Sequence, residues 1–216
     1  MADNITKAVK GAYKKVISDY RDKVKSEDLD HVYIERFLLG LDPGDKVLDI
    51  GCGTGSLSGE MMQNHQLEVV ATDISEDMVH LAKKLHPRLR VLHMDMRKLK
   101  FPPRHFSGVF ANYSLIHIPD TDVISALKQM RRVLKLKGYL YLALQEPVAK
   151  LDRDGFYPLV YKKEVKMFIN LTTEKEIRFY LKKAGFKVVR VDRRSANAKF
   201  EFPFNKLFVI AQKITQ

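Results

Sequence analysis

The chain has little cysteine and no long apolar run. It contains 216 residues with one cysteine, which excludes an intrachain disulfide and a cysteine-rich metal site. No stretch of about 18 apolar residues is present, so we expect no transmembrane helix. The first residues, MADNITKAVKGAYKKV, lack the apolar segment of a secretory signal. These absences favour a cytoplasmic protein that binds no metal.

The net charge of +12 is unevenly distributed along the chain. Residues 1–45 carry 8 Lys/Arg and 9 Asp/Glu, and residues 46–95 carry 5 and 7. Residues 96–216 carry 25 and 10, so this part alone has a net charge of +15 (25 − 10). The asymmetry indicates an acidic or nucleic-acid partner, or simply the solvated faces of helices. The second explanation is the simpler one.

Strand and helix patterns alternate along the chain, without repeats, low-complexity tracts or long linkers. Three- and four-residue spacing of apolar residues predicts two N-terminal helices, and later segments are separated by turn residues. The predicted helices are 5–24, 27–39, 55–64, 75–86, 121–135 and 174–184. The predicted strands are 46–50, 67–72, 90–94, 107–112, 139–144, 186–193 and 205–212. Repeated β-α-β units require right-handed crossovers and a mainly parallel sheet, which predicts an α/β fold.

The most informative segment is residues 47–55, VLDIGCGTG. An apolar run ends in Asp49 and passes directly into a turn that contains Gly51, Gly53 and Gly55. A strand that leads through a Gly-rich turn into a helix is typical of the nucleotide-binding loop of doubly wound sheets. Glycine is needed because the turn demands unusual backbone angles and lets a ligand approach closely. The G-x-G-x-G spacing differs from the G-x-G-x-x-G of dinucleotide-binding proteins.

Two acids restrict the ligand that this loop would accept. Asp49 lies two residues before Gly51, where it would repel a pyrophosphate and attract an ammonium group. Asp73 lies 20 residues after Gly53 (73 − 53), and a similar spacing separates the loop from the acid that binds ribose hydroxyls in nucleotide-binding folds. An adenosine with a cationic amino-acid tail satisfies both requirements. That molecule is S-adenosylmethionine (SAM).

Six segments in order resemble the class I SAM-dependent methyltransferases of the small-molecule type, which include the ubiquinone/menaquinone C-methyltransferases. The segments are VLDIGCGTG (47–55), VVATDIS (69–75), HMDMRKLKF (93–101), FSGVFANYSLIHIPD (106–120), MRRVLKLKGYLYLAL (130–144) and KKAGFKVVRV (182–191). The resemblance covers roughly residues 45–212. It implies a Rossmann-like doubly wound sheet of seven mostly parallel strands in the order 3-2-1-4-5-7-6, with N-terminal helices. A closing hairpin across 194–204 agrees with this order.

The resemblance also implies how the chain is organised. We expect one domain over residues 1–216, with a helical cap over 1–45 and an insertion over 146–171 on the substrate side. The residues expected to bind the methionine end and the ribose of SAM are Asp49, Gly51, Gly53, Asp73 and Asn112. Those expected around the adenine are Ile74, Met78, Asp95 and the backbone N–H of Met96. Tyr20 is expected to close over the cofactor, with Tyr13 of the same helix as the alternative.

Three of these residues have structural alternatives. Core packing at helical spacing explains Met78 equally well. A turn-capping role is the alternative for Asp95, and a helix-capping role is the alternative for Asp73, although Ser75 already fills that role. Gly55 is expected either in the binding loop or at a helix–strand contact.

The acceptor is expected to be a small molecule, and the charge asymmetry admits an acidic one. Methyl transfer from SAM is an in-line displacement, to which alignment of the reactants contributes strongly. A hydroxyl or an acidic carbon also needs a base. His117, in LIHIPD after the fourth strand, is the candidate base, because ligands bind at the carboxyl edge of such sheets. A structural histidine bonded to a loop backbone is the alternative.

Two differences from the sequence motifs of other methyltransferases argue against adenine and glutamine amino groups as acceptors and exclude cytosine C5. Asn112-Tyr113-Ser114-Leu115 stands where the amino-methyltransferases of adenine and glutamine carry [DNS]-P-P-[YFW], and no Pro-Cys pair is available for attack on cytosine C5. Two alternatives remain open: an RNA methyltransferase that uses the basic half for phosphates, and a non-catalytic SAM-binding protein. Because no RNA-binding module is recognisable, we expect no specific nucleic-acid partner. We expect no membrane partner either, since the sequence has no long apolar run. The oligomeric state is not determined by the sequence.

Overall fold

The computed structural model describes residues 2–23, 26–148, 154–159, 162–197 and 201–214, and for residues 2, 18–23 and 26–28 the backbone alone. Its helices are α1 (Ala2–Lys23), α2 (Ser26–Leu38), α3 (Ser56–Asn64), α4 (Glu76–Leu85), α5 (Asp120–Val133), α6 (Glu174–Ala184) and the short 3-10 helix η1 (Leu115–His117). Its strands are β1 (Lys46–Ile50), β2 (Glu68–Asp73), β3 (Arg90–His93), β4 (Phe106–Asn112), β5 (Leu134–Glu146), β6 (Gly155–Leu159), β7 (Lys162–Ile169), β8 (Phe186–Arg194) and β9 (Asn205–Lys213).

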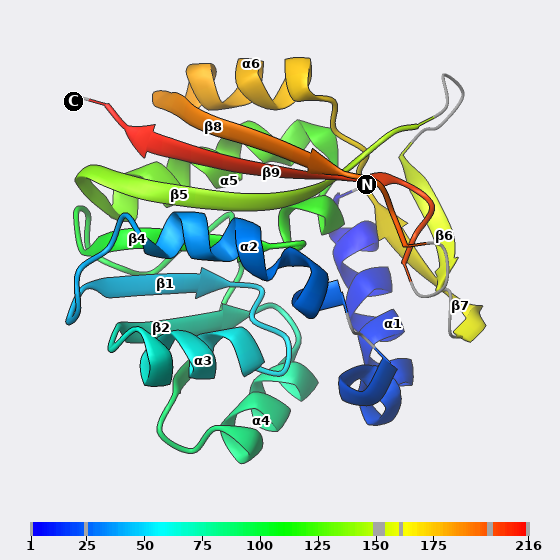
Figure 1. Ribbon diagram of the computed structural model, residues 1–216. Helices are drawn as coiled ribbons and strands as arrows, with labels where there is room; N and C mark the ends of the chain where they lie inside the picture. Colours follow the sequence, from blue (N-terminus) through cyan, green and yellow to red (C-terminus); the bar gives the residue numbers. More distant parts are fainter. Residues whose placement is uncertain (1, 24–25, 149–153, 160–161, 198–200, 215–216) are drawn as a thin grey trace.

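Seven strands form one twisted sheet in the order β3-β2-β1-β4-β5-β9-β8. All neighbours pair in parallel except β9, which is antiparallel to both β5 and β8. The predicted order 3-2-1-4-5-7-6 is confirmed. Because β6 and β7 pair apart from this sheet, β8 is the sixth strand of the sheet along the chain and β9 is the seventh. The carboxyl ends of the parallel strands lie on the side of α1 and the β6–β7 hairpin (Figure 1).

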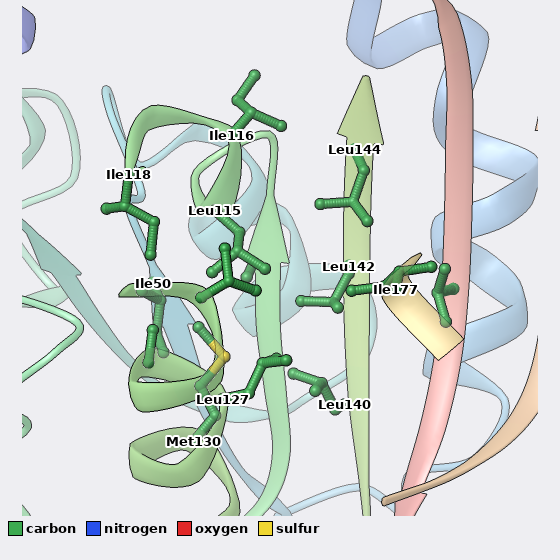
Figure 2. Close-up of a cluster of buried hydrophobic side chains, with 14 of the residues drawn as sticks. Ile50, Leu115, Ile116, Ile118, Leu127, Met130, Leu140, Leu142, Leu144 and Ile177 are labelled. Atoms are coloured by element: carbon green, nitrogen blue, oxygen red, sulfur yellow. The ribbon is translucent and has the colours of Figure 1, made fainter. Parts of the chain in front are cut away.

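Two apolar layers cover the two faces of the sheet, because successive residues of a strand point to opposite sides. Leu140, Leu142 and Leu144 of β5 pack in the cluster that includes α5 and α6, as Figure 2 shows. Tyr141, between them, belongs to the cluster that includes α2, α3 and α4. Its ring stacks on Phe110 of β4 with centroids 4.8 Å apart. The side chains of β5 that point to one face of the sheet therefore pack against α5 and α6, and those that point to the other face pack against α2, α3 and α4.

The predicted helix ends are largely confirmed. Ser75 caps α4, where its side chain accepts from the Met78 amide. Thr173 and Glu176 form a reciprocal capping box at the start of α6, an arrangement that satisfies two otherwise unpaired backbone donors. Gly185 ends α6 at φ 83°, in the left-handed region that glycine occupies without a steric penalty.

The boundary between α5 and β5 differs from the prediction. The sequence predicts a helix to residue 135 that Gly138 closes, whereas α5 ends at Val133 and Leu134 already pairs with β4. Gly138 serves the strand instead: a Cβ at that position would lie 2.8 Å from the carbonyl oxygen of Ser107. Pairing with β4 thus overrides the helical spacing of the apolar residues.

The segment over 146–171 contains the antiparallel pair β6 and β7, and residues 149–153 and 160–161 of it lie outside the described residues. α1 packs against β7 at the carboxyl edge of the sheet. Within the described ranges, no helix is long and apolar enough to cross a bilayer. Nor does any group of three His, Cys, Asp or Glu side chains in this part of the chain have a geometry that could hold a metal ion.

Candidate functional site

A cavity lies at the carboxyl ends of β1 to β5, between these strand ends, α1 and the β6–β7 hairpin. This is where open α/β sheets bind their ligands. The predicted site residues that line its wall are Asp49, Gly51, Gly53, Asp73, Ile74, Asp95, Met96, Asn112 and His117. Two predicted residues are not among those lining it. Tyr20 lies on α1, but its side chain falls outside the described residues.

Met78 is the second exception. Its side chain is 1% exposed, and it is absent from the described wall of the cavity. It lies on the buried side of α4, where its amide donates to the capping Ser75. The structure thus supports the packing explanation for Met78 and gives no support to a contact with adenine.

The glycine turn has the strained and crowded backbone that the sequence predicts. Gly51 has φ 74°, and its amide donates to the Thr72 carbonyl at 2.7 Å. A Cβ at this position would lie 2.3 Å from Cβ of Ser114, so only glycine fits between β1 and the end of β4. Gly55 instead lies against Leu89 and Ala82, which supports a packing role for that glycine.

Asp73 accepts hydrogen bonds from two backbone amides at the cavity wall. One carboxylate oxygen accepts from the Gly53 amide at 2.9 Å, and the other accepts from the Ser75 amide at 2.8 Å. Burial raises the pKa of Asp73, and the two amides counteract part of that rise. Each carboxylate oxygen has a further lone pair. Asp73 therefore fixes the glycine turn and can also accept from a ligand hydroxyl.

Two buried polar atoms in the wall have no hydrogen-bond partner among the described residues. They are Oδ1 of Asn112 and Oγ of Ser114, both where β4 ends. Buried polar groups are nearly always paired, and an unpaired one costs about 1–3 kcal/mol. Asp49, whose carboxylate accepts from the Ser58 hydroxyl, lies at the end of the neighbouring β1. Unpaired acceptors and an acid beside a glycine turn fit a ligand that presents an ammonium group.

Arg97 is a wall residue that the sequence did not reveal. Its guanidinium binds Asp95 at 2.6 Å, Asp122 at 2.7 Å and the Thr6 hydroxyl of α1 at 3.2 Å. Burial raises the pKa of Asp95, but the hydrogen bonds and charge of Arg97 outweigh burial and lower it overall. Asp95 also accepts from the Arg97 amide at 2.8 Å, which is the turn-capping role considered for it. Arg97 joins α1 to the adenine side of the predicted site.

His117 and Tyr13 form a hydrogen-bonded pair in the wall. The Tyr13 hydroxyl lies 2.9 Å from Nε2 of His117, and the carbonyl oxygen of Phe168 lies 2.8 Å from Nδ1. A carbonyl can only accept, so Nδ1 carries the proton of the neutral ring and Nε2 accepts from Tyr13. The backbone contact matches the structural alternative for His117. The contact with Tyr13 places an unprotonated Nε2 in the cavity wall, so the structural role does not exclude the predicted role as a base.

The part of the cavity beyond the predicted cofactor residues is mostly apolar. Its apolar residues include Val9, Ile116, Ile118, Leu159, Met167 and Phe202, and the acid Glu201 also lines it. The buried Lys206 also lines it and donates to Gln145 Oε1 at 2.8 Å and to the carbonyls of Phe202 and Phe204 at 3.0 and 2.8 Å. Burial lowers the pKa of Lys206 to about 8. These residues come from α1, η1, the hairpin and the approach to β9. In these segments the sequence predicted Tyr20, the alternative Tyr13 and His117 at the site and placed the insertion 146–171 on the substrate side, but it named none of the residues just given.

Comparison with known proteins identifies what this chain is similar to. The family of the methyltransferase domain matches residues 47–138. A ubiquinone/menaquinone biosynthesis C-methyltransferase UbiE from Shewanella sp. (strain ANA-3) is 29% identical over 83% of this chain and 76% of its own length. The sterol 24-C-methyltransferase ERG6B of Gibberella zeae is 32% identical over 46% of this chain, which spans only 27% of that relative.

A solved structure shares the fold over the whole chain. It is the Burkholderia thailandensis 1,6-didemethyltoxoflavin-N1-methyltransferase with bound 1,6-didemethyltoxoflavin and S-adenosylhomocysteine. Its TM-score is 0.79 at 19% identity, with 100% of this chain and 91% of that chain covered. The chain is similar to the class I SAM-dependent methyltransferases, and its methyltransferase domain makes it a SAM-dependent methyltransferase. SAM is its cofactor, and the unpaired acceptors of Asn112 and Ser114 and the glycine turn fit it.

Asp73→Ala is expected to weaken binding of S-adenosylhomocysteine to this methyltransferase by about 1–3 kcal/mol, the cost of charge-assisted hydrogen bonds. The change also leaves the Gly53 amide without its acceptor, so the glycine turn loses one hydrogen bond. Calorimetric titration measures the loss. Asp77→Ala, on the outer side of the same chain segment, is the matched control. Equal affinity in all three proteins would exclude Asp73 from the site.

The stability of the methyltransferase is expected to fall between pH 7 and pH 5 because of His117. Burial lowers the pKa of His117 from 6.5 to about 4, and its contact with Phe168 offsets only part of this. Between these values the unfolded chain binds a proton that the folded chain does not, so stability is present above pH 6.5 and is lost as pH falls towards 4. The contribution is about 2 kcal/mol over this interval. Urea unfolding of the wild type and His117→Gln at both pH values measures it; an equal pH effect in both proteins would contradict the assignment.

Proposed function

We propose that this methyltransferase methylates a small, mostly apolar acceptor that carries one ionisable hydroxyl, amine or acidic carbon. The observation that carries the proposal is the Tyr13–His117 pair in the wall of a cavity whose remaining lining is largely apolar. The names of the relatives support a small acceptor, since one is a quinone-biosynthesis enzyme and another acts on a toxoflavin precursor. The segment 146–171 supplies Leu159 and Met167 to this wall, which supports its predicted place on the substrate side.

The cofactor half of the site follows from the residues already described. We assign the ribose hydroxyls to Asp73 and the amino-acid end to Asp49, Asn112 and the turn of Gly51 and Gly53. The adenine lies, in this proposal, among Ile74, Asp95 and Met96. Tyr13 of α1 lines the cavity, whereas the side chain of Tyr20 lies outside the described residues.

SAM supplies an electrophilic methyl group on a positively charged sulfur, so the protein needs only to align the acceptor and receive its proton. In the neutral ring, Nε2 of His117 accepts from the Tyr13 hydroxyl. As the acceptor gives its proton to the Tyr13 oxygen, the tyrosine proton passes to Nε2. Nδ1 keeps its own proton and its bond to the Phe168 carbonyl, which orients the ring and stabilises the imidazolium.

The charges of the wall favour a neutral acceptor over an acidic one. Arg97 binds two carboxylates, and the wall also contains Glu201, whose negative charge acts on the nearby Lys206. Neither cation therefore has a strong attraction left for an anionic substrate. The same pairing weakens the RNA alternative, which needs cations directed at phosphates beside the methyl-transfer site.

A methyl-transfer screen with labelled SAM against metabolite and RNA fractions of a cell extract tests the proposal. Label is expected in the small-molecule fraction, with no transfer by a Gly51→Ala blank. Label confined to RNA would replace the proposal with the RNA alternative. Binding of SAM without transfer to any fraction would favour the non-catalytic alternative.

A further inference from the structure

Tyr113 has a strained backbone at the edge of the sheet where the cavity lies. Its φ is 50°, in the left-handed region that is unfavourable for a residue with a side chain. The other non-glycine residues with positive φ in the described part of the chain are Gln66, Arg104 and Lys137, which lie near the amino ends of β2, β4 and β5. Strain of this kind persists only where neighbouring contacts enforce it, and it is concentrated at functional sites.

Two hydrogen bonds enforce this conformation, one from the backbone of the residue and one from its side chain. The amide of Tyr113 donates to the Ala143 carbonyl at 3.1 Å, and its hydroxyl donates to Oδ2 of Asp30 at 2.8 Å. Asp30 belongs to α2 and is fully buried. Its other carboxylate oxygen accepts from Nε of Arg194 at 2.7 Å, and Arg194 also binds Glu201. The hydroxyl of Tyr113 is therefore bonded to a carboxylate that an arginine holds in place.

The Tyr113 hydroxyl stays protonated at neutral pH. Burial raises its pKa well above the usual value, and the charge and hydrogen bond of Asp30 raise it further. Burial also raises the pKa of Asp30, an effect that the hydrogen bond from Tyr113 and the charge of Arg194 partly offset. The hydroxyl therefore keeps the proton that it donates to Asp30, and a phenylalanine at this position would lose the contact completely.

The two residues on either side of Tyr113 carry the unpaired oxygens of the cavity wall. Oδ1 of Asn112 and Oγ of Ser114 are buried without a hydrogen-bond partner among the described residues, and both residues line the cavity. A change of φ at Tyr113 would rotate the chain between them, so it would redirect one oxygen relative to the other. The backbone conformation of Tyr113 therefore determines whether both oxygens meet the same ligand.

We propose that Asp30, through Tyr113, is a positioning residue for the cofactor. The buried carboxylate holds the tyrosine, and the tyrosine holds the backbone that directs the oxygens of Asn112 and Ser114 at the amino-acid end of SAM. Asp30 is not among the described residues that line the cavity, so it acts on the cofactor only through Tyr113. The inference rests on the proposed function, which assigns the amino-acid end of SAM to this part of the wall.

Calorimetric titration of Tyr113→Phe with S-adenosylhomocysteine and with methylthioadenosine tests the proposal. Methylthioadenosine keeps the adenosine but lacks the amino-acid end. We expect S-adenosylhomocysteine to bind about tenfold more weakly to the variant and methylthioadenosine to stay within about twofold of wild type, because only the amino-acid end meets the redirected oxygens. Tyr141→Phe is the matched control. It removes a buried tyrosine hydroxyl from the neighbouring β5, one without a partner among the described residues, and both affinities should stay within about twofold.

Asp30→Ala removes the acceptor of the same hydrogen bond, while Arg194 keeps its bonds to Glu201. We expect the same selective loss, and no further loss in Asp30→Ala/Tyr113→Phe, because residues that act through one contact are not additive. If Asp30→Ala does not fold, Tyr113→Phe alone decides.

Three results would overturn the proposal, and they identify different errors. A lower urea midpoint of Tyr113→Phe with wild-type affinity for S-adenosylhomocysteine would make the contact with Asp30 purely structural. Equal weakening of both ligands would mean that Tyr113 acts on the adenosine or on the whole site. Equal affinity of the wild type for the two ligands would contradict the assigned amino-acid end in the proposed function, and the positioning role with it.

Discussion

Gly51→Ala is expected to abolish measurable binding of S-adenosylhomocysteine and to unfold at a lower urea concentration than the wild type. The new methyl group would lie 2.3 Å from Cβ of Ser114, at a backbone φ of 74°. The left-handed conformation costs a non-glycine residue about 1–2 kcal/mol, and overpacking adds about 1–3 kcal/mol. Relief of the clash has to move the turn or the end of β4, where the unpaired Asn112 and Ser114 oxygens lie.

Gly44→Ala separates the two causes. Gly44 has φ 85°, but nothing lies within 4 Å of the position that its Cβ would occupy. This control carries the backbone strain without the clash, so it should lose about 1–2 kcal/mol of stability and keep wild-type affinity for S-adenosylhomocysteine. Urea unfolding and calorimetry on the three proteins give both quantities. Retained affinity in Gly51→Ala would mean that the turn does not contact the ligand.

The cofactor half of the site was predictable because its residues lie at the ends of consecutive parallel strands. Asp49, Asp73 and Asp95 each follow or end an apolar run, and parallel pairing brings such ends to one edge of the sheet. The strand order then follows from the right-handed crossovers and the family resemblance. Local pattern and global topology agree in this half of the chain, and these three acids therefore line one cavity.

The acceptor half depends on contacts between segments far apart in the sequence. The Tyr13 hydroxyl meets a histidine 104 residues away, and Lys206 reaches Gln145 across 61 residues. Arg97 looks like a surface cation in the sequence, yet it joins two acids and α1. No periodicity or spacing encodes such meetings, because they depend on how α1 and the segments after β5 pack on the finished sheet. Met78 shows the opposite case: it lies close to the second motif in the sequence, but it is absent from the described wall of the cavity.

His117→Gln is expected to lower the rate of methyl transfer about 10²–10⁴-fold, the range for loss of a positioned base, while affinity for S-adenosylhomocysteine stays within about threefold of wild type. Glutamine can still donate to the Phe168 carbonyl but cannot take a proton at neutral pH. Turnover of the acceptor found in the screen and calorimetry measure the two effects. His80→Gln, on the exposed face of α4, is the matched control.

Tyr13→Phe tests whether the proton passes through the tyrosine. If it does, this variant and His117→Gln each remove the whole relay, so the double variant should be no slower than the slower single one, because residues that act as a unit are not additive. Two independent roles predict instead that the rate losses multiply. The Tyr13→Phe change removes only the hydroxyl: Phe keeps the edge-to-face ring contact with His117, whose centroids lie 5.6 Å apart, but Nε2 of His117 loses its donor. Wild-type turnover in His117→Gln would reduce His117 to a residue that holds β7 against η1.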